Sequence, residues 1–149
     1  MVIRLTKEFS FEAAHVLEGY DGKCSQIHGH SYRLQVTVSG EPCRRASDPK
    51  EGMTLDFGEL KRIVNGEIVD RLDHSLVVRR GTEGDWRTTL KSVFANIVET
   101  DYQPTCENML SDFAVRLRDR LPQGVMLHSL RMYETATSYA EWYAEDNPR

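Results

Sequence analysis

The sequence predicts an α+β fold in which an antiparallel sheet carries two helices on one of its faces. Three stretches alternate polar and apolar residues, as half-buried strands do, and two others repeat apolar residues at the spacing of an amphipathic helix. The chain has 149 residues, of which 40% are hydrophobic and 28% charged. That length suffices for one hydrophobic core, and we expect residues 1–149 to form a single domain.

The first two strands are predicted over residues 2–15 and 30–38. In the first strand the odd positions from Ile3 to Ala13 are apolar, with Lys7 as the exception, and the even positions from Arg4 to Glu12 are polar. In the second strand the even positions are apolar and the odd positions polar. Since one loop joins the two stretches, we expect them to form a hairpin with one buried face.

The first helix is predicted to begin at a capping box formed by Asp56 and Glu59, and its apolar stripe extends to Leu72. Residues 79–91 are polar and are predicted as a loop. A short strand or a helical turn is expected at 92–99. The sequence of residues 79–103 carries no motif that indicates a function for this segment.

The second helix is predicted to begin at Thr105, its expected N-cap, and to end before Pro122. Residues 125–134 then return to alternation and form the last predicted strand. This alternation places Met126, Leu130 and Met132 in one inward row.

Composition and charge exclude several classes of protein. The chain carries 19 Lys and Arg against 23 Asp and Glu, a formal charge of −4, and no long basic run, so we expect no nucleic-acid partner. No stretch reaches the roughly 18 uncharged apolar residues of a membrane span, and no secretory signal is present. The three cysteines, Cys24, Cys43 and Cys106, cannot all pair with one another. We expect a cytoplasmic protein with reduced thiols.

Three of the five histidines are predicted to meet at one end of the hairpin. His28 and His30 are two residues apart, so both point to the apolar face, and His15 has the inward parity of the first strand. Imidazoles crowded on an apolar face cannot all find hydrogen-bond partners, whereas one Zn²⁺ accepts three nitrogens and keeps a fourth position open. We therefore predict a zinc site; the alternative is that these are packed core or capping histidines.

Cys24 lies in the loop between the two strands, four residues before His28. It is either a fourth ligand that closes a structural site, or a free side chain that acts as a base or nucleophile. The spacing alone does not choose between these roles.

Six motifs occur in order between residues 9 and 134: Phe-Ser-Phe-Glu-Ala-Ala-His15, Cys24-x-x-x-His28-Gly-His30-Ser-Tyr, Leu55-Asp-Phe-Gly-Glu-Leu-Lys61, Leu72-Asp73-His74, Pro104-Thr-Cys-Glu107-Asn108 and a late Glu134. Together they resemble the 6-pyruvoyl-tetrahydropterin synthase superfamily. The three-residue gap between Cys24 and His28 resembles its 6-carboxy-tetrahydropterin synthase branch, which belongs to queuosine biosynthesis. The biopterin branch usually has a longer gap.

The resemblance implies a T-fold, whose sheets join edge to edge into trimeric barrels that stack as a homohexamer. It also implies that His15, His28 and His30 hold zinc and that Cys24 is a catalytic base and not a ligand. In that family the active site lies between subunits.

The resemblance further implies that Asp73 and His74 form a proton relay to the catalytic base, and a neighbouring chain can supply it. Without the resemblance, the pair could equally be a surface acid and a histidine at a helix C-terminus. The family also places a pterin-pocket residue at Glu107, although a carboxylate in a first helical turn is favoured by the helix dipole in any case.

Glu134 ends the inward row of the last strand, and a buried anion needs a partner. The pterin amide and 2-amino group offer two parallel N–H donors to a carboxylate, and the resemblance implies this anchoring role. The alternative is a strand-end glutamate in solvent or paired with Arg131.

The function implied is that of a zinc-dependent lyase acting on a small-molecule pterin triphosphate. It would convert 7,8-dihydroneopterin triphosphate to 6-carboxy-5,6,7,8-tetrahydropterin, acetaldehyde and triphosphate. One alternative is 6-pyruvoyl-tetrahydropterin formation, which eliminates triphosphate and keeps all side-chain carbons. Another is a noncatalytic pterin- or metal-binding module, and the presence of Cys24, Asp73 and His74 together counts against it.

Overall fold

The computed structural model describes residues 1–81 and 85–148. Its strands are β1 (Ile3–His15), β2 (His28–Gly40), β3 (Ser75–Arg79), β4 (Ile97–Thr100), β5 (Val125–Tyr133) and β6 (Tyr139–Tyr143). Its helices are η1 (Lys23–Ser25), α1 (Phe57–Val64), η2 (Asn65–Val69), α2 (Asp70–Leu72), α3 (Trp86–Val93) and α4 (Cys106–Arg118). The predicted α+β class is confirmed, and residues 82–84 of the predicted loop lie outside the described residues.

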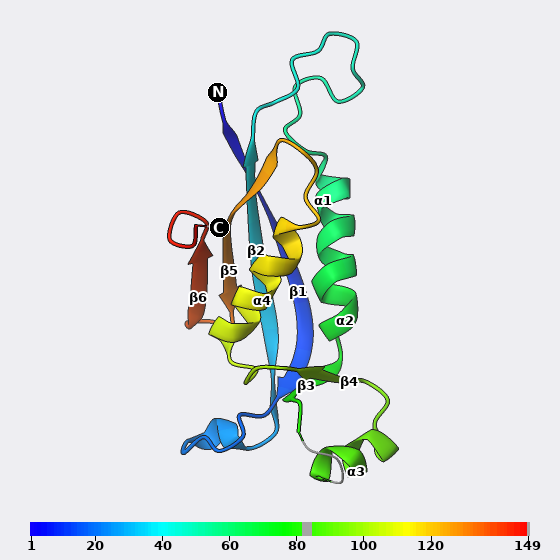
Figure 1. The fold of residues 1–149 in the computed structure, drawn as a ribbon, viewed down its shortest axis with the longest axis vertical. Helices are drawn as coiled ribbons and strands as arrows, with labels where there is room; N and C mark the ends of the chain where they lie inside the picture. Colours follow the sequence, from blue (N-terminus) through cyan, green and yellow to red (C-terminus); the bar gives the residue numbers. More distant parts are fainter. Residues whose placement is uncertain (82–84, 149) are drawn as a thin grey trace.

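The strands form a six-stranded sheet in the order β4-β3-β1-β2-β5-β6. The run from α1 to α2 and helix α4 cover the same face of this sheet (Figure 1). A core of buried side chains lies between the helices and the sheet, with Phe11 stacked on Tyr32 at 5.1 Å and edge-on to Phe113 at 6.4 Å. The two predicted helices therefore pack as expected.

The predicted hairpin is confirmed by the pairing of β1 with β2. The two strands are antiparallel over their full lengths, and His15 lies opposite His28 while Ala13 lies opposite His30. Because side chains alternate along each strand, this register puts the three histidines on the helix-covered face. The other face of β1 and β2 is polar and largely exposed.

The sheet is mixed, which corrects the prediction of a wholly antiparallel sheet. β1, β2, β5 and β6 are antiparallel neighbours, but β3 pairs in parallel with β1 and β4 in parallel with β3. The helical run from α1 to α2 returns the chain to the end of the sheet where β3 starts alongside the last residues of β1. β3 then runs opposite to β2 and in the direction of β1, and so it pairs in parallel with β1.

The predicted inward row of the last strand is wrong at Met126, which is 64% exposed, whereas Leu127 is buried. The register against β2 shifts between Leu127 and Ser129, so that His128 is an extra residue. Such a bulge reverses the alternation of side chains. Leu130 and Met132 do point inward, as predicted.

Both predicted helix starts are confirmed. Asp56 accepts hydrogen bonds from the backbone N–H groups of Gly58 at 2.6 Å and Glu59 at 3.2 Å, and Thr105 accepts one from Asn108 at 3.3 Å. The first helical run contains the π-helical turn η2 in its middle. None of the described helices is long and apolar enough to cross a membrane.

Helix α3 corrects the prediction of a loop over 79–91. Asp85 caps this helix by accepting a hydrogen bond from the N–H of Arg87 at 2.9 Å. Its apolar residues Trp86, Leu90 and Val93 fall at helical spacing, but they are exposed or half-buried, and the one buried residue of the helix is Arg87. This apolar spacing is short and lies among polar residues, so the predicted loop missed a helical period that is present in the sequence.

Candidate metal centre

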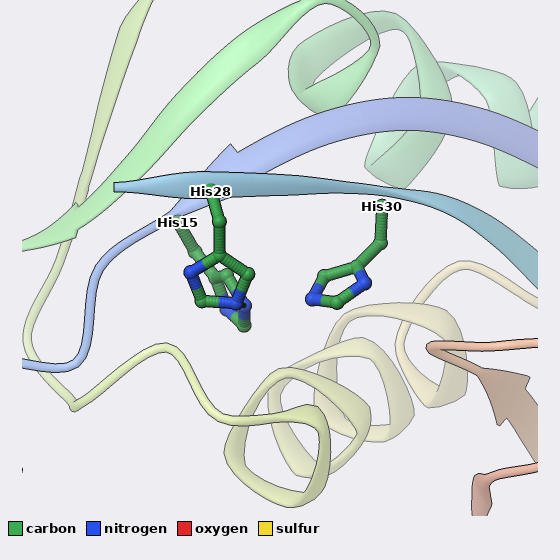
Figure 2. Close-up of side chains that lie close together, drawn as sticks. All are labelled: His15, His28 and His30. Atoms are coloured by element: carbon green, nitrogen blue, oxygen red, sulfur yellow. Dashed lines mark hydrogen bonds between the residues drawn. The ribbon is translucent and has the colours of Figure 1, made fainter. Parts of the chain in front are cut away.

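Three imidazole rings converge at the end of the β1–β2 hairpin. His15 comes from the last position of β1, and His28 and His30 come from the start of β2, all on one side of the strands (Figure 2). Their ligand nitrogens lie within 4.8 Å of one another. His15 is 1% exposed, and its ring faces the segment that leads into α4.

Backbone carbonyls fix the tautomers of two of these histidines. Nδ1 of His15 lies 2.7 Å from the carbonyl oxygen of Pro104, and Nδ1 of His28 lies 2.8 Å from that of Gln26. A carbonyl oxygen can only accept a hydrogen bond, so each Nδ1 carries the hydrogen and donates it. In the neutral rings both Nε2 atoms then present lone pairs.

The two Nε2 atoms of His15 and His28 are 3.0 Å apart. Two lone pairs cannot hydrogen-bond to each other, so this contact is favourable only with a proton on one of the rings or with a metal ion between them. Burial lowers the pKa of the His15 ring and also that of the His30 ring. Protonation of these two imidazoles is therefore disfavoured at neutral pH. Nε2 of His30 is also buried without a hydrogen-bond partner among the described residues. The donor set therefore fits a metal ion that accepts three imidazole nitrogens.

Glu134 lies beside the cluster. Its Oε1 is 3.6 Å from Nε2 of His15 and 3.8 Å from Nε2 of His30, and its side chain is 28% exposed. The backbone N–H of Glu134 donates to the carbonyl of Ser138 at 3.1 Å, which holds the residue at the β5–β6 turn. A carboxylate is thus fixed at the edge of the site with one side open to solvent.

Cys24 lies in η1, in the loop that joins the two histidine-bearing strands, and is half-buried. Among the described residues, the group able to hold a metal contains the three histidines and not the Cys24 sulfur. The backbone N–H of Leu17 donates to the carbonyl of Cys24 at 2.9 Å. This arrangement favours the free role for Cys24 over the role of a fourth ligand.

Asp73 and His74 follow α2. One carboxylate oxygen of Asp73 accepts a hydrogen bond from the N–H of Glu12 at 2.9 Å, and the other lies 3.0 Å from Nδ1 of His74. These two partners hold the pKa of Asp73 below its usual value. His74 lines a hollow of about 410 Å³ together with Glu12 and Ser31. The alternation along β1 and β2 puts Glu12 and Ser31 on the face opposite the three histidines.

His74 adopts a positive φ of 57°, a conformation that costs a non-glycine residue free energy. Its N–H donates to the carbonyl of Glu12 at 2.6 Å, and Nδ2 of Asn96 donates to its carbonyl at 3.0 Å. No motif in the sequence points to Asn96 as a residue of the site. A residue that acts through a backbone carbonyl carries no motif that the sequence could reveal.

Two further residues complete the surroundings of the site. Tyr32, which the sequence places in the apolar row of β2, is 1% exposed; its hydroxyl lies 3.4 Å from Nδ1 of His15, and burial raises the pKa of this phenol. Glu107 is on the exposed side of the first turn of α4. Among the described residues, the side chains that could hold a metal ion are those of the three histidines, and Glu107 is not one of them.

The chain is similar to known proteins over nearly its whole length. Residues 4–145 match the family model described as 6-pyruvoyl tetrahydropterin synthase. The chain is 34% identical over 143 residues to a protein of Haemophilus influenzae named 6-carboxy-5,6,7,8-tetrahydropterin synthase, covering 95% of this chain and 99% of that protein. A Synechocystis protein of the same name is 31% identical over 138 residues, covering 93% and 91%.

Among solved structures, an uncharacterized protein from Wolinella succinogenes aligns with a TM-score of 0.72 at 21% identity, covering 96% of this chain and 98% of that one. The 6-pyruvoyl tetrahydropterin synthase of Caenorhabditis elegans aligns with a TM-score of 0.67 at 23% identity, covering 96% of both chains. These alignments confirm the predicted T-fold.

Proposed function

Because the chain belongs to the 6-pyruvoyl tetrahydropterin synthase family, we propose that it is a zinc-dependent 6-carboxy-5,6,7,8-tetrahydropterin synthase. Its substrates would be 7,8-dihydroneopterin triphosphate and one water molecule, and its products 6-carboxy-5,6,7,8-tetrahydropterin, acetaldehyde and triphosphate. The observation that carries the metal site is the pair of Nε2 lone pairs that face each other across 3.0 Å. Relatives above 30% identity that bear this synthase's name, among them those of Haemophilus influenzae and Synechocystis, support the reaction.

His15, His28 and His30 would hold Zn²⁺ with their Nε2 atoms, while the carbonyls of Pro104 and Gln26 orient two of the rings. When bound, the ion supplies a Lewis acid that stabilises negative charge on a substrate oxygen.

In the proposed reaction, Cys24 removes the proton from the side-chain carbon beside that oxygen, acting as general base. His74 returns or passes protons near neutral pH, and Asp73 orients the His74 ring through the 3.0 Å contact to its Nδ1. Glu134, fixed at the edge of the histidine cluster, accepts the N–H groups of the pterin ring and sets the orientation of the substrate.

The branch of the reaction is tested by product analysis. Zinc-loaded protein given 7,8-dihydroneopterin triphosphate is expected to release acetaldehyde in step with triphosphate, because the short gap between Cys24 and His28 resembles that of the carbon–carbon-cleaving branch. Both products should be lost in Cys24→Ala and in His74→Ala. Triphosphate without acetaldehyde would move the assignment to 6-pyruvoyl formation, and neither product with intact pterin binding would indicate a binding module.

We further propose that the relay reaches the metal centre of a neighbouring chain in an oligomer, the hexamer implied by the resemblance. Within one chain, His74 lines a hollow together with Glu12 and Ser31, whose side chains point away from the face that carries the three histidines. The edge strands β4 and β6 each have one strand neighbour in this chain, and unpaired strand edges favour association.

Complementation tests this arrangement. Neither Cys24→Ala nor His74→Ala should turn over substrate alone, but their co-expressed mixed oligomer should regain activity. If the two residues of a site come from different chains, about a quarter of the sites in an equal mixture contain both. No recovery in a mixed oligomer verified by mass spectrometry would place both residues in one chain, and a monomer in light scattering would also refute the proposal.

Glu134→Gln should weaken pterin binding by about 2–4 kcal/mol and leave zinc content unchanged, since glutamine turns one acceptor into a donor that faces a donor. Fluorescence titration with a pterin that lacks the triphosphate measures this loss. Glu145→Gln, at an exposed position near the C-terminus, is the matched control. Affinity within about twofold of the wild type would show that Glu134 only ends a strand.

A further inference from the structure

Helix α3 is held in place by a charged side chain. Arg87 is 5% exposed, whereas the apolar Val93 and the following Phe94 are 68% and 58% exposed. Surface helices usually dock through an apolar stripe. The position of α3 therefore depends on what the Arg87 guanidinium binds.

The Arg87 guanidinium joins three segments of the chain. It forms ion pairs with Glu18, in the loop after β1, and with Asp85, the N-cap of α3. Its Nε donates to the carbonyl of Arg79 at the end of β3, at 2.6 Å. The plane stacks on the ring of Trp86 at 4.5 Å, and Nε1 of Trp86 also donates to Glu18, at 3.1 Å. A buried guanidinium with partners on several sides is a rigid connector.

The Glu18 end of this connector belongs to the loop that carries Cys24. The carbonyl of Glu18 accepts a hydrogen bond from Nε2 of Gln103 at 2.8 Å. The preceding residue, Leu17, donates its N–H to the carbonyl of Cys24 at 2.9 Å. Glu18 is thus held by Arg87 at its side chain and by Gln103 at its backbone. Its neighbour Leu17 is bonded directly to the backbone of Cys24. The loop and α3 lie at the same end of the molecule (Figure 1).

We propose that Arg87 is a positioning residue for Cys24: by binding Glu18, it fixes the loop between β1 and β2 relative to the three histidines. The inference deepens the proposed function, since it rests on Cys24 as the catalytic base. A base must be held close to the proton it removes, and displacement by about 1 Å can cost about 100-fold in rate. Among the described residues, no hydrogen bond or ion pair joins Arg87 or Glu18 to the three histidines, so we expect their effect on the reaction to pass through the loop.

The test uses full-length, zinc-loaded protein and three variants: Arg87→Gln, Glu18→Gln and the double variant. Arg80→Gln is the matched control, because it removes the same charge from the same segment but breaks an exposed ion pair with Asp101. Iodoacetamide alkylation of Cys24 is followed by peptide mass spectrometry, with Cys43 in the same sample as the internal reference. Zinc content and steady-state kinetics are measured on the same preparations.

We expect the alkylation rate of Cys24, relative to Cys43, to rise about fivefold in Arg87→Gln and in Glu18→Gln. The double variant should show no further increase, because both changes break the same contact. Zinc should stay near one ion per chain. The kcat should fall about tenfold, with KM within about twofold of the wild-type value. Arg87→Lys keeps the positive charge but lacks the planar guanidinium that binds several partners, so it should recover part of kcat.

A Cys24 alkylation rate within about twofold of the wild type in folded Arg87→Gln and Glu18→Gln would overturn the proposal. If Arg87→Gln does not fold, Glu18→Gln decides alone, since that side chain is 44% exposed. Loss of zinc in these variants would also overturn it, because the contact would then support the metal site. If the wild type does not turn over the pterin triphosphate while alkylation responds as expected, the proposed reaction fails and the coupling of Arg87 to the Cys24 loop stands.

Discussion

His15→Ala is expected to remove both the bound zinc and the turnover of the protein. His15 is the most buried of the three histidines, and Pro104 holds its ring so that Nε2 points at Nε2 of His28. Losing only the outer partner of a metal-bound histidine already costs about 10–100-fold in affinity or activity. Loss of the ligand itself should therefore lower zinc affinity by more than about 100-fold.

His28→Ala and His30→Ala should behave in the same way, because each removes one of three converging nitrogens. The matched control is His128→Ala, which removes a half-buried histidine of β5 that is not part of the cluster. Zinc per chain, measured by elemental analysis after dialysis, and release of triphosphate are the two readouts. If His15→Ala keeps one zinc per chain while turnover falls, the ion is bound elsewhere and the histidines serve another purpose.

The predictable part of this fold is the part governed by local alternation. The polar and apolar pattern of β1 and β2 indicates which side chains share a face. Because the loop over residues 16–27 is too long to set the register, it is this alternation that brought His15 and His28 to the same end and face of the hairpin. The helix starts at Asp56 and Thr105 were predictable for the same local reason, since a capping side chain acts within three residues.

The parts that the sequence did not reveal depend on contacts between distant segments. The parallel pairing of β3 with β1 joins residues 13–15 to 75–77. An apolar run as short as Leu76-Val77-Val78 does not indicate which strand it pairs with. The bulge at His128 reverses an alternation that looks regular along the chain. Helix α3 is held by Arg87 and Glu18, which are 69 positions apart. The backbone hydrogen bond from His74 to Glu12 likewise joins segments that are distant in the sequence.

Cys24→Ala is expected to abolish turnover while zinc stays near one ion per chain. The three histidines form a metal-binding group without the Cys24 sulfur, so removal of the thiol leaves all three ligands in place. A general base contributes about 10²–10⁴-fold to the rate, and a loss of that size should appear in kcat.

Cys43→Ala is the matched control for this variant, because it deletes a half-buried thiol from the loop after β2, at the other end of that strand from His28. Elemental analysis and triphosphate release are measured on both variants and on His15→Ala. A Cys24→Ala protein that loses its zinc as readily as His15→Ala would show that the sulfur is a fourth ligand. The fourth tetrahedral position would then be filled by the protein, as in structural zinc sites, and no substrate oxygen could reach the metal. Retained zinc with turnover lost leaves that position free for the substrate, as the proposed reaction requires.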